Sequence, residues 1–280
     1  KENLWVIADG ERKDRLAKNG LNINDKVYSL HIKTPAEAHG VDLLFVCTKY
    51  TQLRDSLPDI ETITDKHTMV VSLLNGVDSE ELIGQRIGME HMIYSLIRIA
   101  SHRIGNSIHF SLPKGYNGIY IGIPNQPACQ DPRLAAIAEI FADTPVTLHL
   151  SDDILLDMWD KFGLNVSRNL PQAILGVGIG VYDDSIYADA IMRRMRHEVV
   201  LVANAKGIPL TDEFKAAKWL PSQRYSTLQD LDAHRHTEID MFSGALIRMG
   251  KEVGVECPYN EMTYNLIKAL EEKNDGKFDY

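Results

Sequence analysis

The stretch Val41-Asp42-Leu43-Leu44-Phe45-Val46-Cys47 decides the fold class, because it is a nearly continuous apolar run of strand length. Such a run is typical of a strand that is buried on both faces. Similar runs occupy residues 4–8 and 68–74, and helical spacing occupies 11–18 and 79–87. Buried strands that alternate with helices indicate an α/β fold, in which helices cover both faces of a parallel sheet.

The pattern changes toward the middle of the chain. Between residues 92 and 123 the helical signal thins out, and the runs 107–112 and 118–123 predict antiparallel additions at the end of the sheet. A predicted helix at 132–141 and a predicted strand at 146–150 then close this part of the chain.

After about residue 152 the strand signal largely disappears. Helical spacing continues through residues 154–170, 185–206, 237–253 and 259–272. This change of periodicity predicts two domains, a sheet domain at 1–150 and a helical domain at 151–280.

Composition narrows the function classes. The chain has 280 residues and a net charge of −9, which argues against a general nucleic-acid-binding or anionic-membrane surface. No apolar run approaches the roughly 18 residues of a membrane span. We interpret Cys47, Cys129 and Cys257 as reduced packing residues of a cytoplasmic protein, with Cys47 in the middle of a strand. The cysteines and histidines show no metal-ligand spacing, so we predict no metal site.

The segment 159–169 carries the strongest chemical signal. It places Lys161, Asn165 and Asn169 four residues apart, so that on an α-helix they share one face. A lysine held against apolar neighbours can lose proton affinity and act as an acid–base group, and amides beside it can hold substrate oxygens. The alternative is a solvated polar stripe on an amphipathic helix.

The first residues lack a signal that a dinucleotide-binding sheet normally carries. Such a sheet opens with a strand that runs into GxGxxG and a helix. Here the pattern starts at what would be the second strand, with Asp9 in the place of the residue that meets the adenosine ribose. We therefore expect the sequence to be incomplete at its N-terminus; the alternative is a divergent, cofactor-free protein. The glycines of 176–180 follow a helix rather than a strand, so we interpret them as a turn with close packing.

Four stretches together resemble the ketopantoate reductase (2-dehydropantoate 2-reductase) family, from residue 4 to about residue 270. They are Val46-Cys47-Thr48-Lys49, then Leu74-Asn75-Gly76-Val77 with Glu80-Glu81, then the Lys161, Asn165 and Asn169 helix, and finally 226–230 with 236–240 and Gly244. The resemblance implies a Rossmann-type domain followed by a helical domain similar to that of 6-phosphogluconate dehydrogenase. The implied reaction is NADPH-dependent reduction of ketopantoate to (R)-pantoate, in pantothenate and coenzyme A biosynthesis.

The resemblance also implies roles for individual residues. Lys161 would be the catalytic acid and Glu238 the supporting carboxylate. The substrate would be held by Asn165, Asn169 and Ser226, and Asn75 and Lys49 would lie where cofactor and substrate meet. The chemistry agrees, because a proton donor must stand about 3 Å from the oxygen that becomes an alkoxide.

Each of these residues also has a structural interpretation. Ser226 and Thr237 have the spacing of helix-capping boxes, and Glu238 has that of a favourable first-turn charge. Lys49 fits a solvated strand end and Asn75 fits a turn. In one unbroken helix Ser226 and Glu238 would stand about 18 Å apart. If both bind one small acid, the helix must break between residues 229 and 237.

Two departures from the family pattern leave the ligands open. The family commonly has arginine at the end of the second strand, whereas this chain has Asp9, followed by Arg12. Asp9 favours NADH, Arg12 can reach the NADPH phosphate, and the resemblance favours NADPH. Residues 94–98 are bulkier than the small, hydroxyl-rich stretch of the family and include Arg98, which leaves the identity of the substrate open. The alternatives are a dehydrogenase for another 2-oxo or 2-hydroxy acid and a non-catalytic nucleotide sensor. The apolar helical domain is compatible with a homodimer.

Overall fold

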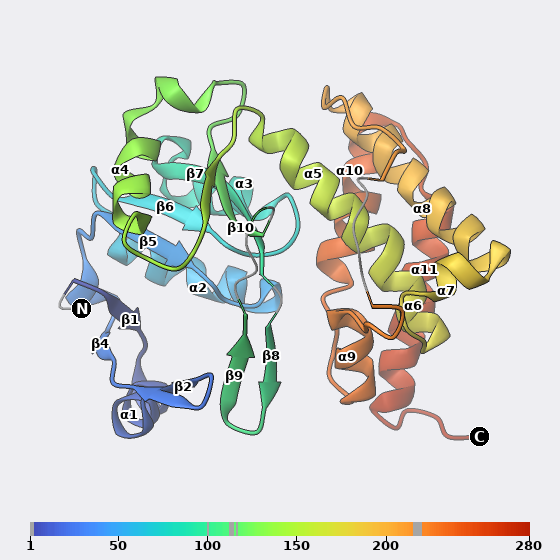
Figure 1. The fold of residues 1–280 in the computed structure, drawn as a ribbon, viewed down its shortest axis with the longest axis horizontal. Coiled ribbons are helices and arrows are strands. Elements are labelled where there is room, and N and C mark those ends of the chain that lie inside the picture. Colours follow the sequence, from blue (N-terminus) through green and yellow to red (C-terminus); the bar gives the residue numbers. More distant parts are fainter. Residues whose placement is uncertain (1–2, 100, 112–114, 116, 215–219) are drawn as a thin grey trace. The chain divides into compact units, whose positions relative to one another are not determined.

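The computed structural model describes residues 3–99, 101–111, 115, 117–214 and 220–280. The chain forms two compact units, which Figure 1 displays with their elements labelled. Unit 1 consists of Lys1–Leu74 and Asp78–Ile154, and unit 2 consists of Asn75–Val77 and Leu155–Tyr280. The short loop 75–77 therefore belongs to the helical unit, although the chain on both sides of it belongs to the sheet unit.

The main sheet of unit 1 has five strands in the order β11-β10-β7-β6-β5. Strands β5, β6 and β7 are parallel, β10 is antiparallel to β7, and β11 is parallel to β10. The α/β class with a parallel sheet is thus confirmed, as is the antiparallel addition of β10. The strands are β5 (Leu43–Val46), β6 (Met69–Ser72), β7 (Met92–Arg98), β10 (Gly118–Gly122) and β11 (Leu148–Leu150).

Helices cover both faces of this sheet, as the continuous apolar strands predict. Val71 and Ile93 form one core cluster with Leu134 and Ile137 of α4, and α3 packs on β6 and β7. Helix α2 packs in turn on α3. These helices are α2 (Tyr50–Ile63), α3 (Ser79–Ile87) and α4 (Pro132–Phe141), with single turns at η1 (Ala36–Ala38), η2 (Met89–His91) and η3 (Ala128–Gln130).

Two small sheets are separate from the main sheet, whereas the sequence predicted a single sheet. Strand β1 (Trp5–Ile7) pairs in parallel only with β4 (His31–Lys33) among the described strands, and α1 (Gly10–Asn19) follows β1. The other sheet has the order β3-β2-β9-β8. Its strands are β2 (Leu21–Ile23), β3 (Lys26–Tyr28), β8 (Ser101–Ile104) and β9 (Ser107–Phe110).

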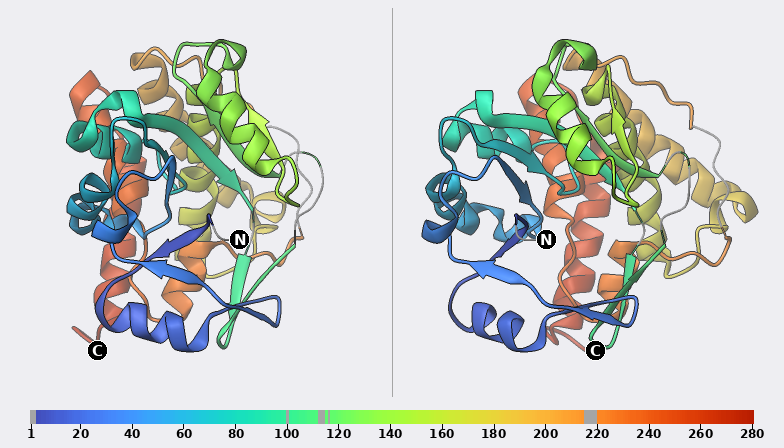
Figure 2. Two further views of the ribbon diagram at one scale, coloured as in Figure 1. Left: turned by 90° about the vertical axis from the view of Figure 1, so that its left-hand side faces the viewer. Right: turned by 60° about the vertical axis from the view of Figure 1, so that its left-hand side comes forward.

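Strand β9 was expected at the end of the main sheet, and its partners explain why it is elsewhere. The side chain of Asn24 accepts from the Phe110 N–H and donates to the Phe110 carbonyl, each at 3.0 Å. Ser107 donates to the Asn22 side chain at 3.1 Å. These bonds align β9 with β2. Figure 2 shows the β2–β3 hairpin and the β8–β9 hairpin side by side. Residue 112, the predicted end of this strand, lies outside the described residues.

Unit 2 is helical, as predicted. The long predicted helix of residues 154–170 contains a π-helical segment, which the α-helical spacing did not reveal. The elements of unit 2 are α5 (Ile154–Leu164), π segment η4 (Asn165–Asn169), α6 (Leu170–Leu175), α7 (Val181–Asp184), α8 (Ile186–Ala205), α9 (Ser226–Asp232), π segment η5 (Asp240–Gly244), α10 (Ala245–Val253) and α11 (Pro258–Asn274).

Pro171 gives a physical reason for the π segment η4. Proline has no N–H to donate to the Ser167 carbonyl four residues earlier, and its ring clashes with that carbonyl in an α-helix. The wider π turn relieves the clash. The Ser167 hydroxyl also donates to the Gly163 carbonyl at 2.7 Å, which loosens the same turn.

Local predictions in unit 2 have mixed outcomes. The helix after Ser226 ends at Asp232 and helical structure resumes only at Asp240, so the predicted break is confirmed. Gly178 and Gly180 lie so close to Pro221 that a Cβ on Gly178 would stand 2.3 Å from its carbonyl oxygen, which confirms close packing.

Cysteine packing was predicted correctly at only one position. Cys257 is buried, but Cys47 and Cys129 are exposed. Cys47 comes directly after β5 rather than in the middle of it, so its side chain leaves the covered part of the sheet. In the part of the chain that the structure describes, no helix is both long enough and apolar enough to cross a membrane.

Candidate active site

Lys161 is held by an amide from a distant part of the sequence. It lies near the end of α5, and its Nζ donates to the Asn75 Oδ1 at 2.8 Å. Both side chains are half-buried. The positive φ of +97° in the turn of this loop belongs to Gly76. Because the Asn75 side chain binds Lys161, Asn75 does not act only as a turn former. The structure therefore brings together two residues that the sequence predicted for the site.

The two further asparagines lie beside each other on the π segment that follows. Asn169 Nδ2 is 3.5 Å from Asn165 Oδ1, and Asn169 is buried. A four-residue step overshoots one turn of an α-helix but falls short of one turn of a π-helix. The π turn thus offsets the angular drift of the preceding α turn, which helps to keep Asn169 on the side of Lys161.

Glu238 lies just before the second π segment. Its side chain is half-buried, and Gly244 N donates to the Ile239 carbonyl at 3.0 Å, a bond of π type. Segments η4 and η5 pack against each other inside unit 2. The segments that follow Lys161 and Glu238 are therefore neighbours. That the two charged groups themselves meet stays a prediction.

Ser226 is exposed at the first position of α9. The N-cap position belongs to Tyr225, which makes no side-chain cap bond, and the Gln229 amide donates to the Arg224 carbonyl at 2.7 Å. The capping-box interpretation of Ser226 is therefore wrong. Helix α9 packs against η4, so Ser226 belongs to a helix that borders the asparagine segment.

The loops after β5 and β6 follow the carboxyl ends of parallel strands, the edge at which such sheets bind ligands. Lys49 is exposed at the N-cap position of α2, without a side-chain cap bond. The adjacent Tyr50 hydroxyl donates to Asp78 at 2.7 Å. This bond ties the loop of Lys49 to the far end of the loop that carries Asn75.

A buried acid at this edge had no predicted role. Glu80 is 1% exposed and accepts from the Ser79 hydroxyl at 2.9 Å. Ser79 and Ser72 share a 2.8 Å hydrogen bond, and Ser95 donates to the Ser72 carbonyl. Burial raises the pKa of Glu80 to about 7, although the hydrogen bonds from Ser79 and the backbone oppose this shift. The network anchors both ends of the loop that carries Asn75.

Asp9 and Arg12 lie on the small β1–β4 part of unit 1. Asp9 is exposed after β1, and its carboxylate accepts from the Gly10 N–H at 2.7 Å at the start of α1. Arg12 is exposed on α1. The neighbouring Lys13 pairs with Glu37 at 3.0 Å. The pKa of Glu37 falls to about 2, mainly because the Thr34 N–H and Lys13 bind its carboxylate.

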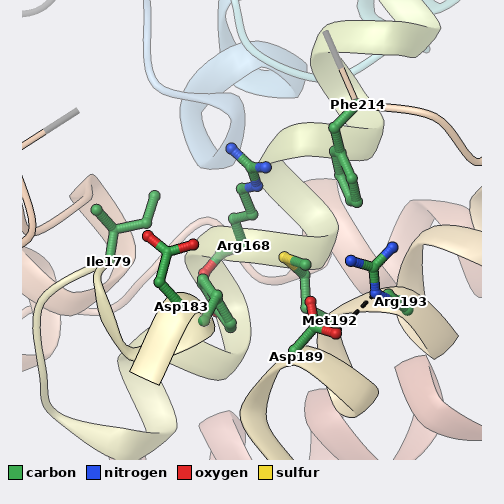
Figure 3. Close-up of a pocket in the computed structure, with 8 residues that line it drawn as sticks. Arg168, Ile179, Asp183, Asp189, Met192, Arg193 and Phe214 are labelled. Carbon is green, nitrogen blue, oxygen red and sulfur yellow. Dashed lines mark hydrogen bonds and ion pairs between the residues drawn. The ribbon is translucent and has the colours of Figure 1, made fainter. Parts of the chain in front are cut away.

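A cavity of about 290 Å³ in unit 2 contains none of the predicted site residues. Arg168, Asp183, Asp189, Arg193 and Phe214 are among its lining residues, and Figure 3 shows Arg193 paired with Asp189. The Arg168 guanidinium carbon stands 4.5 Å from the centre of the Phe214 ring. Burial lowers the pKa of Arg168. We do not place the reaction here, because the lysine–asparagine set lies outside this cavity.

A buried ion pair that no sequence pattern predicts lies beside Lys161. Arg196 on α8 is 1% exposed, and its Nη2 is 3.2 Å from Asp160 Oδ1 and 2.9 Å from the Thr211 carbonyl oxygen. Arg196 Nη1 also donates to the Asp160 carbonyl at 3.3 Å. The pair fixes the residue before Lys161 to α8. Asp160 and Arg196 are far apart in sequence, and no spacing rule connects them.

No cluster of three or more histidine, cysteine, aspartate or glutamate side chains that could hold a metal ion occurs among the residues the structure describes.

Comparison with known sequences identifies the family. Residues 1–126 match the family described as ketopantoate reductase PanE/ApbA, and residues 153–271 match ketopantoate reductase PanE/ApbA C terminal. The chain belongs to the ketopantoate reductase family. The resemblance inferred from the four sequence stretches is thus confirmed.

Several relatives of this ketopantoate reductase family member are similar over most of their length. A 2-dehydropantoate 2-reductase of Streptococcus pyogenes serotype M3 is 29% identical over 272 residues, which cover 91% of this chain and 86% of the relative. A PanE/ApbA family ketopantoate reductase from Ralstonia eutropha JMP134 is 25% identical, with a TM-score of 0.81 and coverage of 96% and 91%. A D-mandelate dehydrogenase solved with NADH is also 25% identical, with a TM-score of 0.82 and coverage of 97% and 91%.

Proposed function

We propose that this chain reduces the 2-oxo group of ketopantoate to give (R)-pantoate, with a reduced nicotinamide dinucleotide as co-substrate. The observation that carries the proposal is the 2.8 Å hydrogen bond between Lys161 Nζ and Asn75 Oδ1, with Asn165 and Asn169 on the next turns. This arrangement orients an ammonium among neutral amides, inside a chain of the ketopantoate reductase family.

The residues have complementary tasks in such a reduction. Lys161 donates a proton to the carbonyl oxygen as negative charge develops there, and its own charge stabilises that oxygen. Asn75 accepts from Lys161 and fixes its direction. The amides of Asn165 and Asn169 hold the oxygens of the 2-oxo acid, and Ser226 contributes a hydroxyl from α9. Glu238 accepts from a substrate hydroxyl and balances the ammonium.

The residues at the ends of the parallel strands fit a dinucleotide. Asp9 is exposed at the end of β1, where its carboxylate can accept from a ribose hydroxyl. Arg12 is exposed one helical turn later and suits a phosphate. Lys49 follows β5, and Asn75 follows β6. When bound, the cofactor supplies the hydride. We propose NADPH as the donor, with Arg12 at its 2′-phosphate, and NADH as the alternative that Asp9 favours.

A second candidate function is a dehydrogenase for another 2-hydroxy acid. The D-mandelate dehydrogenase relative and the carboxylate of Asp9 both favour it. The bulky residues 94–98 also leave the size of the substrate open. Arg98 ends β7, with its guanidinium carbon 6.0 Å from the centre of the Tyr120 ring.

Steady-state assays with the purified chain separate these functions. We expect NADPH oxidation with ketopantoate at a kcat/KM at least tenfold above that with phenylglyoxylate, the 2-oxo partner of mandelate. A higher kcat/KM with phenylglyoxylate and NADH would replace the proposal by the second candidate. If the chain reduces neither of these 2-oxo acids, the remaining candidate is a non-catalytic nucleotide sensor.

We also propose the assembly, the division of labour and the compartment of the protein. Residues 1–150 form the dinucleotide-binding domain, and residues 151–280 form the substrate and dimerisation domain. Exposed apolar side chains on α8 and α11 support a homodimer through these helices. The three free cysteines support a reducing compartment, the cytoplasm.

A further inference from the structure

The residue immediately before Glu238 is bound by a buried carboxylate. Thr237 N and Thr237 Oγ1 both donate to Glu271 Oε1, at 2.7 and 2.6 Å. Thr237 is 3% exposed, and Glu271, near the C-terminal end of α11, is 2% exposed. Two donors on one charged oxygen make a strong and directional pair of hydrogen bonds. The backbone at Thr237 is thereby fixed to α11.

The other oxygen of Glu271 has its own partner. Lys268 Nζ is 2.8 Å from Glu271 Oε2, and His236 Nδ1 is 3.7 Å from the same atom. A buried carboxylate needs such partners, because removing a charge from water is costly unless it is paired. Burial alone would lower the pKa of Lys268, but its bond to Glu271 and the nearby carboxylates raise it overall.

The same face of α11 also holds the chain on the other side of Glu238. The Tyr264 hydroxyl donates to Asp240 Oδ1 at 2.7 Å, and Lys268 Nζ is 3.8 Å from Asp240 Oδ2. Residues 264, 268 and 271 are spaced along one stripe of the helix. Glu238 therefore lies between two anchored positions, Thr237 and Asp240.

These contacts bind the neighbours of Glu238 on both sides, and Glu238 itself is half-buried. The Thr237 hydroxyl also accepts from the Ile239 N–H at 3.2 Å, so the turn around Glu238 is tied internally as well. Helix α9 ends at Asp232, and helical structure resumes only at Asp240. The Glu238 carbonyl already accepts from the Phe242 N–H at 3.2 Å, and the side chains of α11 add to this backbone bond.

We propose that Glu271, acting through Thr237, is a positioning residue that sets the direction of the Glu238 carboxylate for the reduction of the 2-oxo acid. The inference rests on the proposed function, because it takes Glu238 as the catalytic carboxylate. Glu271 itself does not touch the substrate. A small misplacement of a reacting group can cost up to about 100-fold in rate, so this clamp has a measurable kinetic signature.

The first test compares matched variants in steady-state reduction of ketopantoate. Glu271→Met and Thr237→Val each remove one side of the clamp, and we expect kcat to fall about tenfold or more with the KM for NADPH unchanged. Glu271→Gln keeps an acceptor and Thr237→Ser keeps the hydroxyl, so both should recover most of the rate. Glu272→Met is the control, since Glu272 is the next residue and pairs only at the surface with Lys277.

The second test asks whether the effect passes through Glu238. In a Glu238→Gln background, Thr237→Val should cause no further loss of kcat, because the group it positions is already disabled. An equal loss in both backgrounds would overturn the proposal. So would an unchanged kcat for Thr237→Val in the wild-type background, and Thr237→Val serves even if Glu271→Met does not fold.

The third test does not depend on turnover. Hydrogen exchange of the backbone amides in residues 236–244 should be faster in Thr237→Val than in the wild-type chain, with residues 186–205 unchanged as the internal reference. Wild-type exchange rates at 236–244 would overturn the clamp. If the wild-type chain reduces no 2-oxo acid, the proposed function fails and the positioning role fails with it. Faster exchange would then show a structural clamp only.

Discussion

At the scale of the residue, Lys161 is defined by its partner. Asn75 is 86 positions away in sequence, yet its Oδ1 accepts from Lys161 Nζ at 2.8 Å. The amide oxygen of Asn75 accepts this bond without adding a charge of its own, and it thereby orients the Lys161 ammonium. A proton donor held in a fixed direction is what proton transfer to a substrate requires.

We therefore predict that Lys161→Met lowers kcat by about 10²- to 10⁴-fold, the usual contribution of a general acid. Binding of NADPH, followed by the change in its fluorescence on titration, should stay within about twofold, because Lys161 is predicted to act on the substrate and not to hold the cofactor. Equal losses in kcat and in cofactor affinity would make Lys161 a binding or structural residue instead.

Glu80 yields a prediction about pH, because burial raises its pKa to about 7 from an ordinary value of 4.5. Between these values the folded protein holds a proton that the unfolded chain has released. The free energy of unfolding therefore falls as the pH rises from about 4.5 to 7, and the loss persists above 7. At about 1.4 kcal/mol per pH unit, the loss is on the order of 3 kcal/mol.

Glu80→Gln stays neutral throughout this range. Its stability relative to the wild-type chain should thus increase between pH 4.5 and pH 8, as measured by urea unfolding at both pH values. Glu81→Gln is the matched control, because Glu81 is the next residue and is exposed. A wild-type chain and a Glu80→Gln variant with the same pH dependence would contradict a buried acid with a raised pKa.

The sequence identified single residues where chemistry and local geometry agree, and it failed where a partner came from far away. Lys161 and Asn75 were both predicted, and they are in contact. The capping interpretation of Ser226 was wrong because Tyr225 takes the cap position. Glu271 was not predicted, since a buried carboxylate that binds Thr237 looks in sequence like any surface glutamate on a helix.

At the scale of the element, the π segments are what the hydrophobic pattern could not reveal. An apolar period near four residues is compatible with an α-helix or with a π turn inside one. Pro171 marks the disturbance, but proline also occurs at the first turn of ordinary helices. The positions of Lys161, Asn165 and Asn169 relative to one another depend on this turn, so their exact geometry was beyond sequence reasoning.

Helix α5 also depends on a glycine that makes room for an arginine. A Cβ on Gly163 would stand 2.1 Å from Arg196 Nη1, and Arg196 is buried and bound to Asp160 and to the Thr211 carbonyl. The guanidinium therefore cannot move aside without breaking these bonds. Burial lowers the pKa of Arg196, and the bond to Asp160 opposes this shift.

We predict that Gly163→Ala destabilises the protein by about 1–3 kcal/mol, the usual cost of overpacking a core. In an exposed helix the same change stabilises by about 0.5–1 kcal/mol. The measurement is urea unfolding of Gly163→Ala alone and together with Arg196→Met, which removes the clash. If the alanine costs the same in both backgrounds, the clash with Arg196 is not its cause.

At the scale of the whole molecule, the order of strands and helices along the chain was largely readable. The buried strands at 43–46 and 69–72 and the helix at 79–87 follow from continuous apolar runs and from Gly88 as a stop. The small sheets were not readable, because β2, β3, β4 and β8 are only three or four residues long. The position of such a strand depends on its partners rather than on its own sequence. The hydrogen bonds between Asn24 and Phe110, for example, place β9.

Assembly is the remaining property at this scale. Tyr259, Met262 and Leu266 are exposed on α11, and Tyr187 and Ile191 are exposed on α8. The two helices pack against each other, and Thr263 contacts Met195 while Glu198 binds Asn260, so they run antiparallel. Apolar side chains on adjacent helix faces are costly to leave in water, and burying them against a second copy removes that cost.

We predict that the chain elutes as a dimer of about twice its 31.5 kDa mass in size-exclusion chromatography with light scattering. Met262→Glu should shift it toward the monomer, because a carboxylate would face its own copy across a two-fold axis and lose its water. Leu175→Glu is the control, since Leu175 is similarly exposed at the end of α6 but lies off these two helices. A monomeric wild-type chain, or a Met262→Glu variant that stays dimeric, would mean that this face does not join two copies. The first outcome would also require the complete reaction to take place within a single chain.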